Sequence, residues 1–77
     1  MAAWKVTNYR DTGGRQWVAD LAHDGRIVLG GQRIDILFDY AAKYSQRGDT
    51  YQEEGMSHPI PIEQVWEQYE MQRNLYR

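Results

Sequence analysis

Hydrophobic and polar residues alternate along the first part of the chain, which is the pattern of half-buried β-strands. The alternation predicts strands over residues 4–10 and 16–22, joined by a glycine-containing turn. Trp17, Ala19 and Leu21 fall on one side of the second strand. We therefore expect that side to face the core.

The dipeptide Asp24-Gly25 is the strongest local signal in the chain. An Asp-Gly pair fits the two central positions of a type I′ turn, whose twist matches that of the strands beside it. Residues 26–29 are then predicted to return as a third strand, and the glycine pair that follows is expected to end the sheet. Residues 4–29 thus predict a three-stranded antiparallel meander with one buried face.

The spacing of apolar residues changes after this meander to that of an amphipathic helix. A helix is predicted over residues 32–47, with Gly48 as the residue that ends it. Its apolar stripe consists of Ile34, Leu37, Phe38 and Ala41.

Residues 49–59 are predicted to form an acidic loop, followed by a C-terminal helix over residues 61–76. Pro61 suits the first turn of a helix, because its missing N–H has no partner there. The apolar stripe of this helix consists of Ile62, Val65, Trp66, Tyr69 and Tyr76.

These elements predict an α+β fold with the order β-β-β-α-α. The chain has 77 residues, the size of one domain, of which 42% are hydrophobic and 13% aromatic. Apolar packing must hold the core, because no cysteine is present for a disulfide or a Cys-based zinc site. No stretch approaches the roughly 20 apolar residues that cross a bilayer. We expect a soluble cytoplasmic domain that does not bind membranes, either a monomer or a homodimer.

No catalytic or cofactor motif is present. Two histidines, His23 and His58, lie far apart in the sequence and do not supply the three or four ligands of a zinc site. The glycine pairs do not continue into the Gly-Lys-Ser/Thr of a phosphate-binding loop. We therefore expect neither a metal nor another cofactor, and a protein that is not an enzyme.

Charge divides the chain into two unequal parts. Residues 1–48 carry seven basic against five acidic residues, and residues 49–77 carry two against six, which gives a net charge of −2. An acidic molecule is disfavoured as a general binder of nucleic acids or anionic membranes. The surface charge is therefore the best functional clue in the sequence.

The negative charge gathers in the second part. Glu63, Glu67 and Glu70 recur at i, i+4 and i+7, on one face of the predicted C-terminal helix. Acids near the start of a helix also stabilise it, so this face has a purely structural explanation as well. The functional explanation is an acidic surface for a basic partner, which Asp49, Glu53 and Glu54 would extend. Tyr51 and Tyr76 are the candidate aromatic anchors.

The first part supports a different hypothesis. The run Tyr9-Arg10-Asp11-x-Gly-Gly-Arg15-Gln-Trp17 resembles the first strands of the arm-binding N-terminal domain of phage-type integrases, over about residues 4–45. This resemblance implies a small domain that reads DNA with its three-stranded sheet. The candidate DNA-binding residues are Lys5, Arg10, Arg15 and Arg26.

The chain as a whole resembles the small phage-encoded inhibitors of bacterial defence, notably anti-CRISPR proteins. The shared characters are small size, acidity, the absence of cysteine and the acidic stripe Glu63-Glu67-Glu70. This resemblance implies a non-enzymatic inhibitor in the host-cell cytoplasm. Its acidic helix and loop would occupy the basic surface of a nucleic-acid-handling partner such as a CRISPR effector subunit. We take this as the main hypothesis and DNA binding as the alternative.

Overall fold

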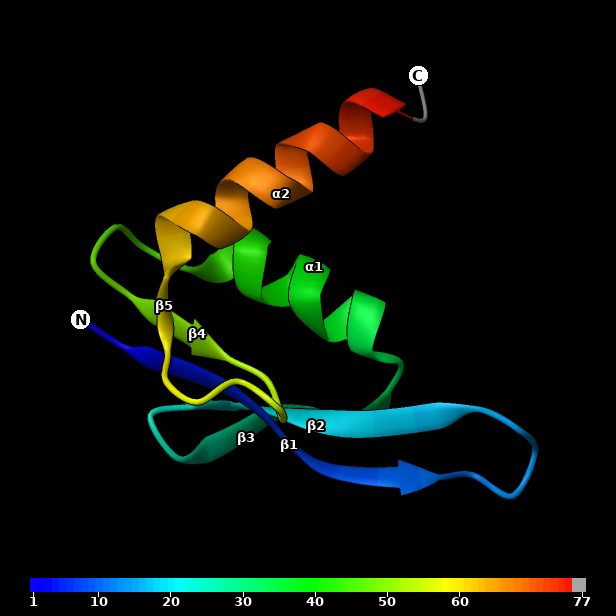
Figure 1. Cartoon of the computed structure of the whole chain (residues 1–77). Coiled ribbons are helices and arrows are strands. Elements are labelled where there is room, and N and C mark those ends of the chain that lie inside the picture. Colours follow the sequence, from blue (N-terminus) through cyan, green and yellow to red (C-terminus); the bar gives the residue numbers. More distant parts are fainter. Residues whose placement is uncertain (76–77) are drawn as a thin grey trace.

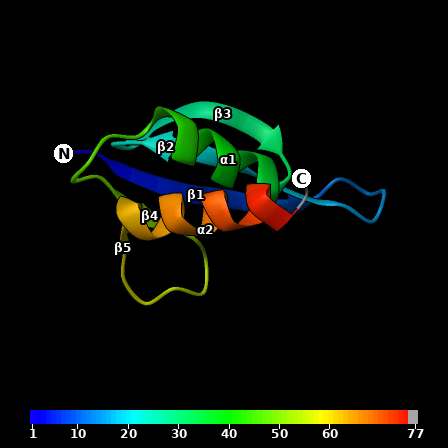
Figure 2. The same ribbon diagram turned by 90° about the horizontal axis from the view of Figure 1, so that it is seen from above.

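Two helices lie side by side on one face of a twisted five-stranded sheet in the computed structural model, which describes residues 1–75 (Figures 1 and 2). The elements are β1 (Ala3–Asp11), β2 (Trp17–His23), β3 (Arg26–Gln32), α1 (Ile34–Tyr44), β4 (Thr50–Gln52), β5 (Ile60–Pro61) and α2 (Ile62–Leu75). The sheet order is β3-β2-β1-β4-β5. The α+β class is confirmed, and the antiparallel meander of β1, β2 and β3 forms one part of this larger mixed sheet.

The predicted type I′ hairpin is confirmed. Asp24 and Gly25 take φ angles of 51° and 84°, both positive as this turn requires. The flanking residues His23 and Arg26 are paired across the two strands. The Asp-Gly pair therefore sets the register between β2 and β3.

The alternation of β1 is interrupted by a β-bulge at Asn8, which takes a φ of 57°. Thr7 pairs with Asp20 and Arg10 pairs with Val18, so β1 has one residue more than β2 in this interval. The extra residue reverses the faces of β1: Val6 points into the core before the bulge, and Tyr9 packs against the core after it.

The glycine pair in β3 does not end the sheet, so that expectation is wrong. β3 continues through Gly30 and Gly31 to Gln32, with a register shift before Ala19 pairs with Gln32. Gly31 takes a φ of 66°, which a glycine adopts without steric cost, and the strand bends there instead of stopping.

The end of the β1–β2 hairpin projects beyond the helices (Figure 1). Ala19 and Leu21 are fully buried as expected, but Trp17 on the same side of β2 remains 59% exposed. The expectation that Trp17 belongs to the core is wrong, because neither α1 nor α2 extends over that end of the hairpin.

Helix α1 begins and ends inside its predicted bounds. It stops at Tyr44, and Ser45 is already extended with a φ of −87°. The Ser45 hydroxyl accepts a hydrogen bond from the Trp66 indole N–H at 2.8 Å, which links the end of α1 to α2. Gly48 takes a φ of 94° in a separate turn further along, so its predicted role as the residue after the helix is wrong.

The segment predicted as an acidic loop, residues 49–59, contains one short strand, and a second strand follows it and includes Pro61, the predicted first residue of the C-terminal helix. Thr50–Gln52 forms β4, which runs parallel to β1, and Ile60–Pro61 forms β5 beside it. A parallel neighbour requires a crossover, and α1 supplies it. The loop prediction was wrong here because a three-residue strand shows too few positions for its period to be recognised.

One apolar core joins the sheet to both helices. Ile62 and Val65 of α2 are fully buried, and Trp66 and Tyr69 pack against the same core, which confirms most of the predicted stripe. Tyr76 lies outside the described residues. The fully buried side chains of greatest volume are Tyr51, Leu21, Leu37, Ile62, Val6 and Val65.

Candidate functional site

The acidic face of α2, formed by Glu63, Glu67 and Glu70, points to solvent. Ile62 and Val65 are anchored in the core, and this fixes the rotation of the helix about its axis. All three glutamates are exposed on the outward side. The sequence-predicted face is therefore available for contact over most of the length of the helix.

Little positive charge offsets this face. Among residues 1–75 the ion pairs are Arg10–Asp20 and Arg33–Asp35, and neither involves α2. Arg73 lies over the ring of Tyr69, with 5.7 Å between its guanidinium carbon and the ring centroid. Glu63 accepts one hydrogen bond from the Gly48 N–H at 3.1 Å, which neutralises no charge.

Asp49 does not extend the acidic surface, because it is buried at 5% exposure. Its carboxylate accepts hydrogen bonds from the Ala2 N–H, the Trp4 indole N–H and the Gln46 N–H, each at 2.9 Å. Burial by itself would raise the pKa of Asp49, but these bonds and the nearby N-terminal charge lower it overall. Asp49 thus links the start of β1 to the turn at Gln46 that precedes β4.

Tyr51 is not an exposed anchor, so that expectation is wrong. Its side chain is 1% exposed, and its ring packs edge-on against Phe38 with centroids 5.7 Å apart. The Tyr51 hydroxyl donates a hydrogen bond to a Glu53 carboxylate oxygen at 2.6 Å. Burial, with this bond to a carboxylate, raises the pKa of Tyr51. Glu53 is correspondingly half-buried and held in one orientation.

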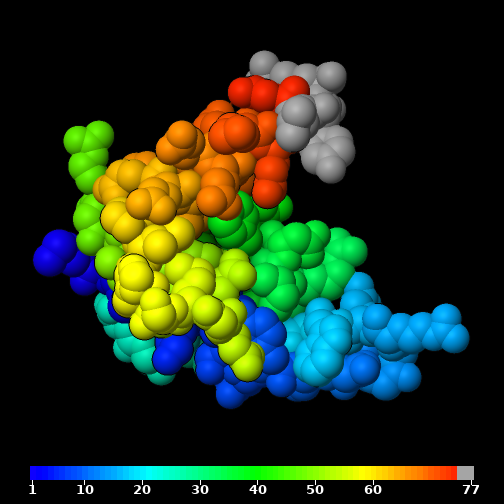
Figure 3. All heavy atoms as spheres, in the orientation of Figure 1, coloured from blue at the N-terminus to red at the C-terminus, as the bar shows by residue number. Residues whose placement is uncertain are grey.

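The two loop acids are separated from the acidic face of α2. The loop between β4 and β5 extends away from α2 in both ribbon views, and in the space-filling view its yellow atoms lie below the orange atoms of α2 (Figures 1, 2 and 3). The Tyr9 hydroxyl accepts a hydrogen bond from the Glu54 N–H at 3.0 Å, which ties the loop to β1. Glu53 and Glu54 therefore line an open groove of about 310 Å³ beside β1 rather than the α2 surface.

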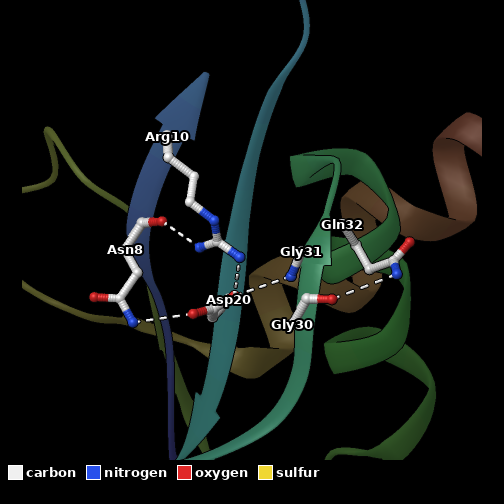
Figure 4. Close-up of polar contacts among 6 residues, drawn as sticks. All are labelled: Asn8, Arg10, Asp20, Gly30, Gly31 and Gln32. Atoms are coloured by element: carbon white, nitrogen blue, oxygen red, sulfur yellow. Dashed lines mark hydrogen bonds and ion pairs between the residues drawn. The ribbon is translucent and has the colours of Figure 1, made fainter. Parts of the chain in front are cut away.

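A second carboxylate that accepts three hydrogen bonds is Asp20, which the sequence did not indicate (Figure 4). Its carboxylate accepts hydrogen bonds from Arg10 at 3.0 Å, Asn8 at 3.0 Å and the Gly31 N–H at 2.9 Å. The Arg10 guanidinium, the Asn8 amide and the Gly31 N–H lower the pKa of Asp20 to about 2. Asn8 and Gly31 are the positive-φ residues of the two irregular strands beside β2, so the cluster holds both irregularities in place.

The four basic residues of the DNA-binding alternative do not form one surface. Arg10 is engaged with Asp20 and also donates to the Asn8 carbonyl oxygen at 2.8 Å. Arg15 lies in the β1–β2 turn with a φ of 73°, whereas Arg26 lies beside the hairpin turn at the other end of β2. Lys5 is exposed in β1 near the Arg26 end, because it pairs with Ala22 and Arg26 pairs with the next residue, His23; Arg15 is at the opposite end.

Both histidines have structural surroundings. His23 packs edge-on against Trp4, with ring centroids 4.5 Å apart, and His58 shares a hydrogen bond with the adjacent Ser57 hydroxyl at 2.9 Å. Over residues 1–75 no three His, Asp or Glu side chains are grouped so that they could hold a metal ion. Within the same range no helix is long and apolar enough to cross a membrane.

Comparison with known proteins finds no family model, no curated protein and no solved structure that matches this chain, so the case for its function rests on its own residues.

Proposed function

We propose that the protein is a non-enzymatic protein-binding module that presents the acidic face of α2 to a basic partner. The observation that supports this most is the combination of a firmly seated helix with three exposed glutamates along its outer side that form no ion pair among residues 1–75. A fixed array of like charges accelerates encounter with a surface of opposite sign and disfavours acidic competitors. Helix-dipole compensation explains Glu63 in the first turn but reaches only one turn, so it does not explain Glu67 and Glu70.

Met71 supplies an apolar contact inside this surface. It is 59% exposed and lies one turn after Glu67 and directly after Glu70. Methionine is flexible and polarisable, and it adapts to irregular partner surfaces. Met71 therefore replaces Tyr51 as the anchor in the proposed interface.

The partner that fits this chemistry is a protein whose basic surface normally handles nucleic acid. Carboxylates spaced along a helix can occupy cationic side chains that otherwise neutralise phosphates. This would make the protein an inhibitor of the phage-encoded, anti-CRISPR kind, acting in the host cytoplasm on a complex such as a CRISPR effector. The DNA-binding alternative has less support, because Arg10 is held by Asp20 and the other cations are dispersed.

The test is affinity capture from a native host lysate, followed by mass spectrometry of the retained proteins. The wild-type chain is compared with the variant Glu63→Lys, Glu67→Lys, Glu70→Lys. Glu54→Lys serves as the control, because it reverses an exposed acid away from α2. We expect a defined basic protein or complex to be retained by the wild type and the control and lost with the triple variant. Equal retention by the triple variant contradicts the proposal, as does the recovery of nucleic acid alone.

A further inference from the structure

A second exposed surface lies on α1, and it is apolar. Ile36, Tyr40 and Tyr44 follow one another at intervals of four residues, so they form a single stripe along the helix, which we call the tyrosine face. Ile36 is 37% exposed and Tyr44 is 63% exposed. The rings of Tyr40 and Tyr44 contact each other with centroids 4.5 Å apart.

The tyrosine face is not part of the contact between the two helices. Leu37 and Ala41 are the fully buried residues of α1, and they face the sheet and α2. The rings of Tyr40 and of Trp4 in β1 lie edge to face, with centroids 6.4 Å apart. Seen from above, α1 lies over the β2 side of the sheet and α2 on its other flank (Figure 2). The stripe is thus distinct from the acidic face of α2.

The surface of this stripe is hollowed. A depression of about 280 Å³ is lined by Ile36, Asp39, Tyr40, Lys43 and Tyr44. Exposed aromatic rings beside a depression can fill a matching depression when the same surface meets itself. The arrangement therefore has the shape that a self-association surface requires.

Charges on this face are arranged in a self-complementary way. Asp39 lies in the middle of α1 and Lys43 in its last turn, and both line the depression. If two copies of α1 pack antiparallel across a twofold axis at Tyr40, each Asp39 approaches the last turn of the other copy. Asp39 of one copy then lies about 3 Å along the helix axis from Lys43 of the other, within reach of the long lysine side chain. The same alignment sets Ile36 against Tyr44 and brings the two Tyr40 rings together at the axis. The two helix dipoles also oppose each other, which is favourable.

We propose that the tyrosine face binds a second copy of this chain, through an antiparallel pairing of two α1 helices. One register brings the apolar residues of the two copies together and places Asp39 of each copy within reach of Lys43 of the other. The contact involves little more than one helix per copy, so it falls below the roughly 1,000 Å² of a stable interface. The dimer should therefore dissociate in the micromolar range or above. This proposal does not depend on the function assigned to α2.

The test is sedimentation equilibrium over a concentration series from low micromolar to near-millimolar protein, with circular dichroism to confirm folding. The wild type should show a monomer–dimer equilibrium. Tyr44→Glu should weaken dimerisation at least tenfold, and because Tyr44 is exposed the variant should fold as the wild type does. Glu67→Lys on α2 is the control and should leave the equilibrium unchanged.

Charge exchange tests the alignment itself. Asp39→Lys alone sets two cations against each other across the axis, and Lys43→Asp alone sets two acids against each other. Each single variant should weaken the dimer. The double variant Asp39→Lys, Lys43→Asp should restore it, because the pairs are then exchanged but still opposite in sign. A constant monomer mass for the wild type overturns the proposal. A dimer that is unaffected by Tyr44→Glu, or that the double variant fails to restore, also overturns it.

Discussion

Replacement of Asp49 is the perturbation whose cost follows most directly from the structure. The carboxylate accepts three hydrogen bonds at 2.9 Å, from Ala2, Trp4 and Gln46. The bonds from Ala2 and Trp4 join parts of the chain that are 47 and 45 residues apart. Asp49→Ala leaves these donors without a protein acceptor. The Trp4 bond is buried, so its loss costs about 1–3 kcal/mol, whereas water can reach the two partly buried backbone donors and limit their cost to about 0.5 kcal/mol each.

We therefore expect Asp49→Ala to lower the free energy of unfolding by about 2–4 kcal/mol, a large part of what so small a domain possesses. Asp49→Asn should cost about half as much. In the wild type one carboxylate oxygen accepts the bonds from Trp4 and Gln46, and the other accepts the bond from Ala2. The amide oxygen of asparagine can take the first place and keep two bonds, but the amide nitrogen cannot accept the bond from Ala2. Asp24→Asn is the matched control, because Asp24 also accepts an N-terminal backbone N–H, at 2.8 Å, but is exposed.

The assay is urea unfolding followed by circular dichroism, repeated at several pH values. The pKa of Asp49 is lowered in the folded state, so its ionised form stabilises the fold above the unfolded-state pKa of about 4. This contribution is lost as the pH falls through the lower folded-state pKa. The stability difference between wild type and Asp49→Asn should be constant above about pH 4 and shrink below it. An Asp49→Ala protein within about 0.5 kcal/mol of the wild type refutes the reasoning, because such a change is typical of an unconstrained surface site.

Three further predictions concern other parts of the chain. Gly25→Ala should destabilise the protein by about 1 kcal/mol in thermal unfolding, because its φ of 84° is unfavourable for alanine. The added methyl group meets nothing within 4 Å, so this backbone cost is the whole effect. An unchanged melting temperature would show that the hairpin turn can adopt another conformation. Tyr51→Phe should cost about 1 kcal/mol through the lost bond to Glu53 while the ring stays packed on Phe38, and a loss above about 3 kcal/mol would mean that the hydroxyl holds more than this one contact. Duplex DNA should show no mobility shift with the protein even at low salt, because Arg10 is engaged and the remaining cations are dispersed; a shift that salt abolishes would instead support DNA binding through the sheet.

The sequence predicted the elements whose pattern is local and long enough to repeat. The Asp24-Gly25 hairpin and the two helices were found this way, since turn chemistry and helical spacing act within a few residues. The strand β4 was missed because it has only three residues and depends on pairing with β1, which lies near the start of the chain. The bulge at Asn8 was missed for a related reason: its positive φ is supported by the bond to Asp20, twelve residues away.

The candidate site was predicted only in part for the same physical reason. Helical spacing placed Glu63, Glu67 and Glu70 on one exposed face, as the structure has them. Spacing could not show that Asp49 and Tyr51 turn inward, because their burial depends on Trp4, Phe38 and the start of the chain. The acidic residues of the second part of the chain thus have three different environments. Asp49 is buried, Glu53 and Glu54 lie in a loop bonded to β1, and the glutamates of α2 form an exposed helix face.

The most direct test of the central claim is the association rate of the captured partner with the wild type and with Glu63→Lys, Glu67→Lys, Glu70→Lys, measured by surface plasmon resonance at several salt concentrations. If the acidic face of α2 guides binding, the wild-type rate should fall as salt rises. The triple variant should associate at least tenfold more slowly at low salt and show little salt dependence. A triple variant that associates and dissociates like the wild type would contradict the assignment of the α2 face as the binding surface.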